Sequence, residues 1–197
     1  TGRKIVVSES VFSMDGDCAP LQALAQLCVE HGALLVLDQA HAVLGPNLEC
    51  INGLQVLHVG TLSKTLGALG GFVAGSSRLI ELLINRARTF IFTTGLSPAD
   101  TAAALAALRI CESDEGERLR ARLRFLIDML QPNHSSAIVP IILGEDSAAL
   151  SAAAQLRERG IHVPAIRPPT VPKGTSRLRV ALSAAHTESS LQLLRNA

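Results

Sequence analysis

The sequence has few aromatic residues, few charges and no large excess of charge of either sign. Its 197 residues include no tryptophan, no tyrosine and five phenylalanines. Charged residues make up 18%, below the quarter that is usual in soluble domains, and the formal net charge is +1. This balance gives no electrostatic basis for binding nucleic acid or a membrane surface. Because 48% of the residues are hydrophobic, we expect a large core and a buried interface.

Signatures of metal, disulfide and membrane proteins are also missing. The four cysteines have neither CxxC nor metal-ligand spacing, and we expect free thiols in a reducing compartment. No apolar run approaches the length of a membrane span, and there is no signal-peptide pattern. We therefore predict a cytoplasmic protein without a metal ion. The sequence does not begin with methionine, so we expect a segment of a longer protein.

What the sequence does contain is an alternation of apolar runs and amphipathic stretches. The apolar runs predict short buried strands at residues 4–8, 33–38, 55–60 and 71–75. Helical spacing predicts a helix with Leu21, Leu24, Leu27 and Cys28 on one face, and further helices at residues 77–88, 98–111 and 115–130. Continuous apolar strands that alternate with helices are typical of an α/β fold with a mainly parallel sheet.

The last third of the chain has a different pattern. After a loop at residues 131–136, we expect a strand at 138–143, a helix at 147–160, a strand at 178–183 and a final helix. This is the pattern of a small α+β unit. We therefore predict two domains, residues 1–112 and residues 113–197, with the helix at 115–130 between them.

The most informative stretch is residues 60–67 (GTLSKTLG), together with Asp38 and His41 after the preceding apolar run. A lysine can form a covalent bond with an aldehyde, and an aspartate at a strand end can keep a pyridine nitrogen protonated. A pyridoxal 5'-phosphate (PLP) enzyme needs this pair. Each motif alone is more often structural, since Ser-Lys is common on surfaces and Asp-x-x-His is common at helix starts. Their order, each after an apolar strand, favours the PLP interpretation.

Longer motifs resemble the α-oxoamine synthases, fold-type I PLP enzymes that condense an amino acid with an acyl-CoA thioester. They are residues 9–17 (ESVFSMDGD), 38–42 (DQAHA) and 60–64 (GTLSK). Residues 165–172 (AIRPPTVP) most resemble the branch that joins L-alanine to a pimeloyl thioester in biotin biosynthesis. The resemblance implies an aspartate aminotransferase-like large domain with a small C-terminal subdomain. It also implies a homodimer with a shared active site, and an acyl-CoA or acyl-carrier protein as the acyl donor.

The resemblance also implies a role for each matching residue. Lys64 would bond PLP and act as the base, Asp38 would pair with the ring nitrogen, and His41 would reach the ring oxygen. Ser13 would lie near the same oxygen. Thr61 would contact the phosphate, and Thr94 would reach the phosphate of the neighbouring subunit's cofactor. Arg167, in a proline-stiffened segment, would bind the amino-acid carboxylate, and Thr170 would lie beside the acyl substrate.

Three features separate the chain from the family pattern. Gln39 occupies a position that is usually acidic, and neither the family's glycine-rich phosphate loop nor its ring-stacking histidine can be found. We therefore expect an incomplete enzyme that binds PLP weakly by itself. The alternatives are a glycine-using relative (an aminoacetone-forming ligase or a 5-aminolevulinate synthase) and a non-catalytic dimer partner.

Arg177 and Arg179 alternate with apolar residues, which predicts the polar face of a strand.

Overall fold

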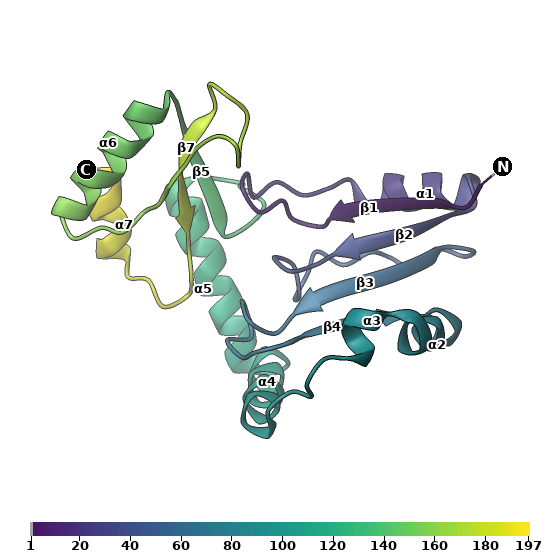
Figure 1. The fold of residues 1–197 in the computed structure, drawn as a ribbon. Helices are drawn as coiled ribbons and strands as arrows, with labels where there is room; N and C mark the ends of the chain where they lie inside the picture. The colour runs from purple at the N-terminus through teal and green to yellow at the C-terminus, as the bar shows by residue number, and fades with distance from the viewer. Residues whose placement is uncertain (1) are drawn as a thin grey trace. The chain divides into compact units, whose positions relative to one another are not determined.

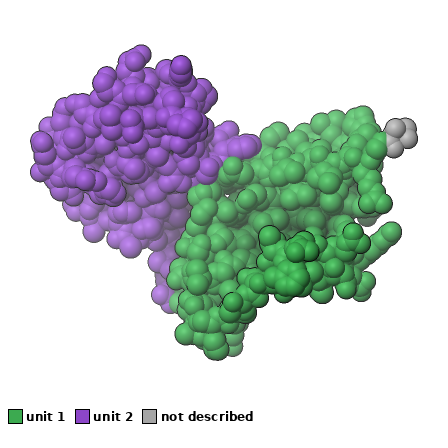
Figure 2. Space-filling model, viewed as in Figure 1, with its two compact units in different colours: residues 1–11, 18–112 green, residues 12–17, 113–197 purple. Residues whose placement is uncertain are grey.

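The computed structural model describes residues 2–197, and contacts divide them into two compact units (Figure 2). Unit 1 contains residues 2–11 and 18–112, and unit 2 contains residues 12–17 and 113–197. Residues 12–17, called segment 12–17 below, therefore belong to unit 2 although both flanking stretches belong to unit 1. No helix among the described residues is long and apolar enough to cross a membrane.

Unit 1 is built on a four-stranded sheet (Figure 1). Its strands are β1 (Lys4–Glu9), β2 (Ala33–Asp38), β3 (Gln55–Thr61) and β4 (Gly71–Gly75), in that order across the sheet. The first three strands are parallel and β4 runs antiparallel to β3. The prediction of a mainly parallel sheet is confirmed. Leu35 and Leu37 of β2 are fully buried, because β2 has a neighbour on each side and a helix over one face.

Helix α1 (Leu21–Glu30) covers part of this sheet. Its Ala25 and Cys28 pack with Ala33 and Leu35 of β2 in one core cluster. The predicted apolar face is wrong at Leu27, which is 51% exposed. Residues at i, i+4 and i+7 share a helix face, so Leu21, Ala25 and Cys28 face the sheet and Leu27 does not.

The rest of unit 1 is helical. It consists of α2 (Ser77–Arg86), α3 (Arg88–Ile91) and α4 (Pro98–Cys111). Residues 90–92 (FIF) are an apolar run of the kind that also forms strands, but the backbone N–H groups of Phe90 and Ile91 donate to the carbonyl of Ala87 and form a helical turn. Ala87 itself is extended, which separates α2 from α3 and ends the first helix earlier than predicted. Three apolar residues in a row do not distinguish a strand from a helix.

Unit 2 contains a three-stranded antiparallel sheet with three helices. Its elements are α5 (Asp114–Leu130), β5 (Ile138–Gly144), α6 (Asp146–Glu158), β6 (Ala165–Ile166), β7 (Ser176–Ala181) and α7 (Glu188–Arg195). The sheet order is β5-β7-β6, with β7 in the centre. The core joins Leu126 of α5, Val139 of β5, Leu178 and Val180 of β7, and Leu191 of α7. Strand β6 was not predicted, because two residues carry no period.

Candidate functional site

The residues with the strongest chemical signal in unit 1 follow the carboxyl ends of parallel strands. In the register of the sheet, Asp38 at the end of β2 lies beside Val59 of β3, and Thr61 ends β3. His41 comes three residues after Asp38, and Lys64 comes three residues after Thr61. Ligands of α/β proteins bind in general at this edge of the sheet, since the loops that follow the strands gather there.

Asp38 is half-buried, and one of its carboxylate oxygens is oriented by the backbone. The N–H of Ala40 donates to Oδ1 of Asp38 at 2.8 Å. The backbone carbonyl of Asp38 accepts from the N–H of Ser10 at 2.8 Å, which joins the ends of β1 and β2. Within residues 2–197, no hydrogen bond to Oδ2 is found. The carboxylate is therefore held in place with one oxygen available to accept a hydrogen bond from a ligand.

Lys64 and His41 are brought together although 23 residues separate them. Nζ of Lys64 lies 3.0 Å from Nε2 of His41. The loop that carries Lys64 is closed by two backbone bonds, from Leu62 N–H to the Gly70 carbonyl and from Ala68 N–H to the Leu62 carbonyl. An exposed primary amine beside an imidazole, on loops that follow two adjacent strands of which one ends at the half-buried Asp38, is a set of groups that suits an aldehyde-bearing cofactor.

The hydroxyl group of Thr61 is already used inside this loop. Its Oγ1 lies 2.7 Å from Oγ of Ser63, accepts from the N–H of Ser63 at 3.1 Å, and is 3.1 Å from the carbonyl of Gly70. A phosphate contact would require the hydroxyl proton to turn away from these oxygens. Thr94 is exposed between α3 and α4.

Gln39 departs from the family pattern, and its side chain contacts another strand. Gln39 is only 9% exposed, and its Oε1 lies 3.1 Å from Nδ1 of His58 in β3. The amide therefore links the turn after Asp38 to the neighbouring strand without adding a charge. This pair could not be predicted from the sequence, because His58 lies inside an apolar run.

The other predicted site residues, Ser13, Arg167 and Thr170, belong to unit 2. Arg167 and Thr170 are exposed, and the N–H of Thr170 donates to the carbonyl of Arg167 at 3.0 Å. Among the described residues, the guanidinium of Arg167 makes no hydrogen bond or ion pair. This turn therefore presents a cation and a hydroxyl to solvent.

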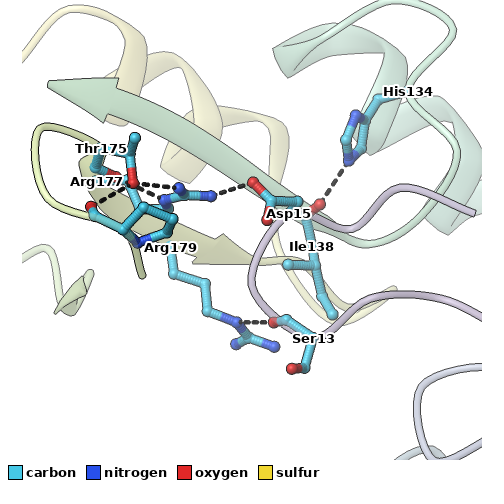
Figure 3. A network of polar contacts seen from close by, with 8 residues as sticks. Ser13, Asp15, His134, Ile138, Thr175, Arg177 and Arg179 are labelled. Atoms are coloured by element: carbon cyan, nitrogen blue, oxygen red, sulfur yellow. Dashed lines mark hydrogen bonds and ion pairs between the residues drawn. The ribbon is translucent and has the colours of Figure 1, made fainter. Parts of the chain in front are cut away.

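Arg177 and Arg179 of β7 bind segment 12–17 (Figure 3). Nη1 of Arg177 forms an ion pair with Oδ1 of Asp15, and Nε of Arg179 donates to the carbonyl of Ser13 at 2.6 Å. The predicted polar face of the strand is confirmed. Arg177 is nevertheless only 3% exposed, because segment 12–17 covers that face.

Arg179 is a functional candidate that the sequence analysis missed. Burial lowers the pKa of its guanidinium, because the charged form loses hydration. Within residues 2–197, only Nε of this guanidinium is bonded, and no carboxylate pairs with it. A half-buried cation without an acidic partner is a suitable place for an anionic ligand group. The relevant signal in the sequence was the pair of arginines two residues apart, which also fits an ordinary strand.

Comparisons with known proteins agree with the fold and with the motifs. The family model for aminotransferase class I and II matches residues 1–197. The 8-amino-7-oxononanoate synthase of Anaeromyxobacter dehalogenans is 52% identical over 209 residues, which cover 96% of this chain and 52% of that protein. The chain thus spans about half the length of the curated relatives it matches.

Solved structures give the same result at lower identity. A structure of SPT with PLP is 30% identical, with a TM-score of 0.85, over 98% of this chain and 53% of that one. The 8-amino-7-oxononanoate synthase of Francisella tularensis is 30% identical, with a TM-score of 0.76, over 98% of this chain and 62% of that one. The expected fold and the expected similarity to the oxononanoate-forming branch are both confirmed. The chain belongs to the aminotransferase class I and II family.

Proposed function

We propose that this chain is part of a PLP-dependent C-acyltransferase that condenses L-alanine with a pimeloyl thioester and releases 8-amino-7-oxononanoate, carbon dioxide and the free thiol of CoA or of the carrier protein. One observation carries the proposal. Lys64 and His41 meet at 3.0 Å on loops that follow two adjacent parallel strands, one of which ends at Asp38. The names of the relatives support the reaction class, and the solved structure of SPT with PLP supports the cofactor.

The groups at this edge of the sheet fit PLP in chemistry. When bound, PLP supplies an aldehyde and an electron-withdrawing ring. Lys64 would form the covalent bond through Nζ, and Asp38 would use a carboxylate oxygen to hold the proton on the ring nitrogen. His41 would donate to the ring oxygen, and the hydroxyl of Thr61 would bind the phosphate. By resemblance, Ser13 of unit 2 would donate to the same ring oxygen.

Lys64 would have a second role as the base of the reaction. Its amine would take the proton from the α-carbon of the amino acid, so that this carbon could attack the thioester. The 3.0 Å contact with Nε2 of His41 gives the amine a neighbour that can exchange a proton with it. Asp38 would contribute by holding the proton on the ring nitrogen.

The carboxylate of L-alanine has two candidate partners in unit 2. Arg167 is exposed next to Thr170, which we place beside the acyl chain, whereas Arg179 is half-buried and bonded to the backbone of Ser13. The alanine variant of the true partner should raise KM for L-alanine about ten- to a hundredfold, since a charge-assisted hydrogen bond is lost. Steady-state kinetics of Arg167→Ala and Arg179→Ala in the intact enzyme therefore separates the two.

We also propose that the enzyme is a homodimer in which Thr94 contributes to the neighbouring subunit's cofactor site. Phe90, Phe92 and Leu96 flank this threonine and are 60%, 74% and 49% exposed, which is unusual for large apolar side chains of a monomer. Sedimentation of the wild type and of Phe92→Glu tests this proposal. A monomeric wild type would contradict it.

Spectroscopy of the chain with PLP tests the cofactor site. A lysine-bound PLP absorbs near the edge of the visible range, and borohydride should abolish this band. Lys64→Ala should lack the band, whereas Lys173→Ala, which removes another exposed lysine, should retain it. A band of normal strength in Lys64→Ala would contradict the assignment.

A further inference from the structure

We propose that Arg177 is a positioning residue for Ser13. Together with Asp15 it holds segment 12–17 against β7 within unit 2, and in this way it fixes the position of Ser13 in that unit. This inference rests on the proposed function, in which Ser13 contacts the ring oxygen of the cofactor. Neither Arg177 nor Asp15 is assigned to the cofactor or to a substrate.

Segment 12–17 is a closed turn that leaves unit 1 and returns to it. Val11 and Cys18 pair as an isolated antiparallel bridge at its two ends. Inside the turn, the N–H of Phe12 donates to the carbonyl of Asp17 at 2.9 Å, and the N–H of Gly16 donates to the carbonyl of Phe12 at 2.8 Å. Because the turn is closed by its own backbone, a force on one of its residues moves the whole segment.

Three side chains of unit 2 bind this turn. Arg177 pairs with the carboxylate of Asp15, and Arg179 donates to the carbonyl of Ser13 at 2.6 Å (Figure 3). Ser135 donates from Oγ to the carbonyl of Gly16 at 2.9 Å. Ser13 thus lies in a segment that is held by contacts within unit 2, whereas Lys64 and His41 belong to unit 1.

Arg177 binds a side chain of the turn, the carboxylate of Asp15, whereas Arg179 and Ser135 bind backbone carbonyls of the turn. The Arg177 guanidinium is also fixed by Thr175, which accepts from Nε through its carbonyl at 2.9 Å and from Nη2 through its hydroxyl at 3.1 Å. Arg177 is buried, whereas the side chain of Asp15 is 50% exposed. A buried cation needs its counter-charge, so the pair favours one position of the turn.

Gly16 shows how closely the turn approaches unit 2. Its φ angle is +68°, and a Cβ at this position would lie 1.9 Å from the carbonyl oxygen of Ile138. That distance is impossible for a real Cβ contact. The same carbonyl lies 2.5 Å from Nε2 of His134 (Figure 3). The turn therefore sits directly on the start of β5.

Directed hydrogen bonds require this kind of placement. A serine hydroxyl is effective only within hydrogen-bonding distance of its acceptor, and a displacement of about 1 Å removes most of the interaction. Ser13 lies in a turn without helix or strand to hold it. The backbone bonds close the turn on itself, and the ion pair of Arg177 with Asp15 fixes the closed turn against β7.

The experiment uses the chain loaded with PLP and compares Ser13→Ala, Asp15→Asn and their double variant. Two absorbance bands of lysine-bound PLP report whether the ring oxygen or the neighbouring nitrogen holds the proton. We expect Asp15→Asn to shift the band ratio and its pH profile in the same direction as Ser13→Ala. The double variant should show no further shift. The matched control is Glu188→Gln, which breaks the exposed Arg122–Glu188 pair in the same unit and should leave the bands unchanged.

Hydrogen exchange and a charge-exchanged double variant test whether the ion pair itself holds the turn. Amide hydrogen exchange at Phe12 and Gly16 should accelerate about ten- to a hundredfold in Asp15→Asn, because the turn loses its attachment to unit 2. The exchanged pair Asp15→Arg with Arg177→Asp should restore part of the band ratio. Unchanged bands in Asp15→Asn, with a normal Lys64 adduct, would overturn this inference alone. Absence of a Lys64 adduct in the wild type would overturn the proposed function as well.

Discussion

The carboxyl edge of the sheet in unit 1 and the arginine face of β7 in unit 2 hold their polar groups in opposite ways. Lys64 and His41 are 23 residues apart, lie on loops next to solvent, and are positioned mainly by backbone bonds. Arg177 and Asp15 are 162 residues apart, and one of the two is buried. The first arrangement is set by strands that are local in sequence. The second exists only after the two distant segments have met.

The largest expected effect concerns the carboxyl edge. Asp38→Asn in the intact enzyme should leave PLP bound but reduce kcat by several powers of ten, because a neutral amide cannot hold a proton on the ring nitrogen. Single-turnover kinetics with quantified PLP content measures both parts. Activity close to that of the wild type would show that Asp38 has only a structural role, like the polar groups on the arginine face of β7.

A smaller effect is expected at the arginine face. Asp15→Ala leaves the Arg177 guanidinium buried without its counter-charge, which should destabilise unit 2 by about 2–4 kcal/mol. Glu188→Ala removes an exposed pair and should cost less than about 1 kcal/mol. Native-state hydrogen exchange of the Leu178 amide in β7 measures the loss of unfolding free energy in both variants. Equal losses would mean that burial of the arginine has no energetic consequence.

Two glycines with a positive φ angle test how closely segment 12–17 packs against β5. Gly16→Ala should cost about 3 kcal/mol or more, since its φ is +68° and the new Cβ would meet the Ile138 carbonyl. Gly174 has a similar φ of +76° with nothing within 4 Å of its virtual Cβ, so Gly174→Ala should cost only about 1 kcal/mol. Chemical denaturation of the two variants gives the difference. Similar losses would show that segment 12–17 can move away from β5.

The smallest effect depends on pH. The pKa of Asp128 is lowered by the side-chain hydrogen bonds from Arg124 and then by the backbone N–H of Asn133. A lowered folded pKa means that the stabilisation is present above the unfolded pKa of this carboxyl. It is lost as the pH falls through the folded pKa. Asp128→Asn should therefore lower the stability slightly at neutral pH and flatten its pH dependence in the acid range, so that the two proteins become equally stable at low pH. Acid titration of both proteins checks this.

The local part of the architecture could be predicted from the sequence. Residues 33–38 form β2 because a continuous apolar run needs neighbours on both sides, and Pro98 opens α4 behind the capping residue Ser97. The short helix Arg88–Ile91 could not be predicted, since the choice between strand and helix there depends on which partner is available.

The candidate site was predictable to the same extent. Asp38, His41 and Lys64 each follow an apolar strand within a few residues, so their meeting follows from the rule that parallel strands end at one edge. The burial of Arg177 and the contact of Arg179 with Ser13 depend on residues more than 160 positions away. Alternation with leucine and valine in β7 gave the correct face of the strand but could not show what covers that face.

Peptide mapping of the PLP-loaded chain after borohydride reduction tests the central claim most directly. Reduction turns the bond between PLP and its lysine into a stable amine, and mass spectrometry then identifies the modified residue. We predict that the adduct lies on Lys64, with Lys4 and Lys173 unmodified. An adduct that is spread evenly over the three lysines, or that is absent from Lys64, would contradict the account.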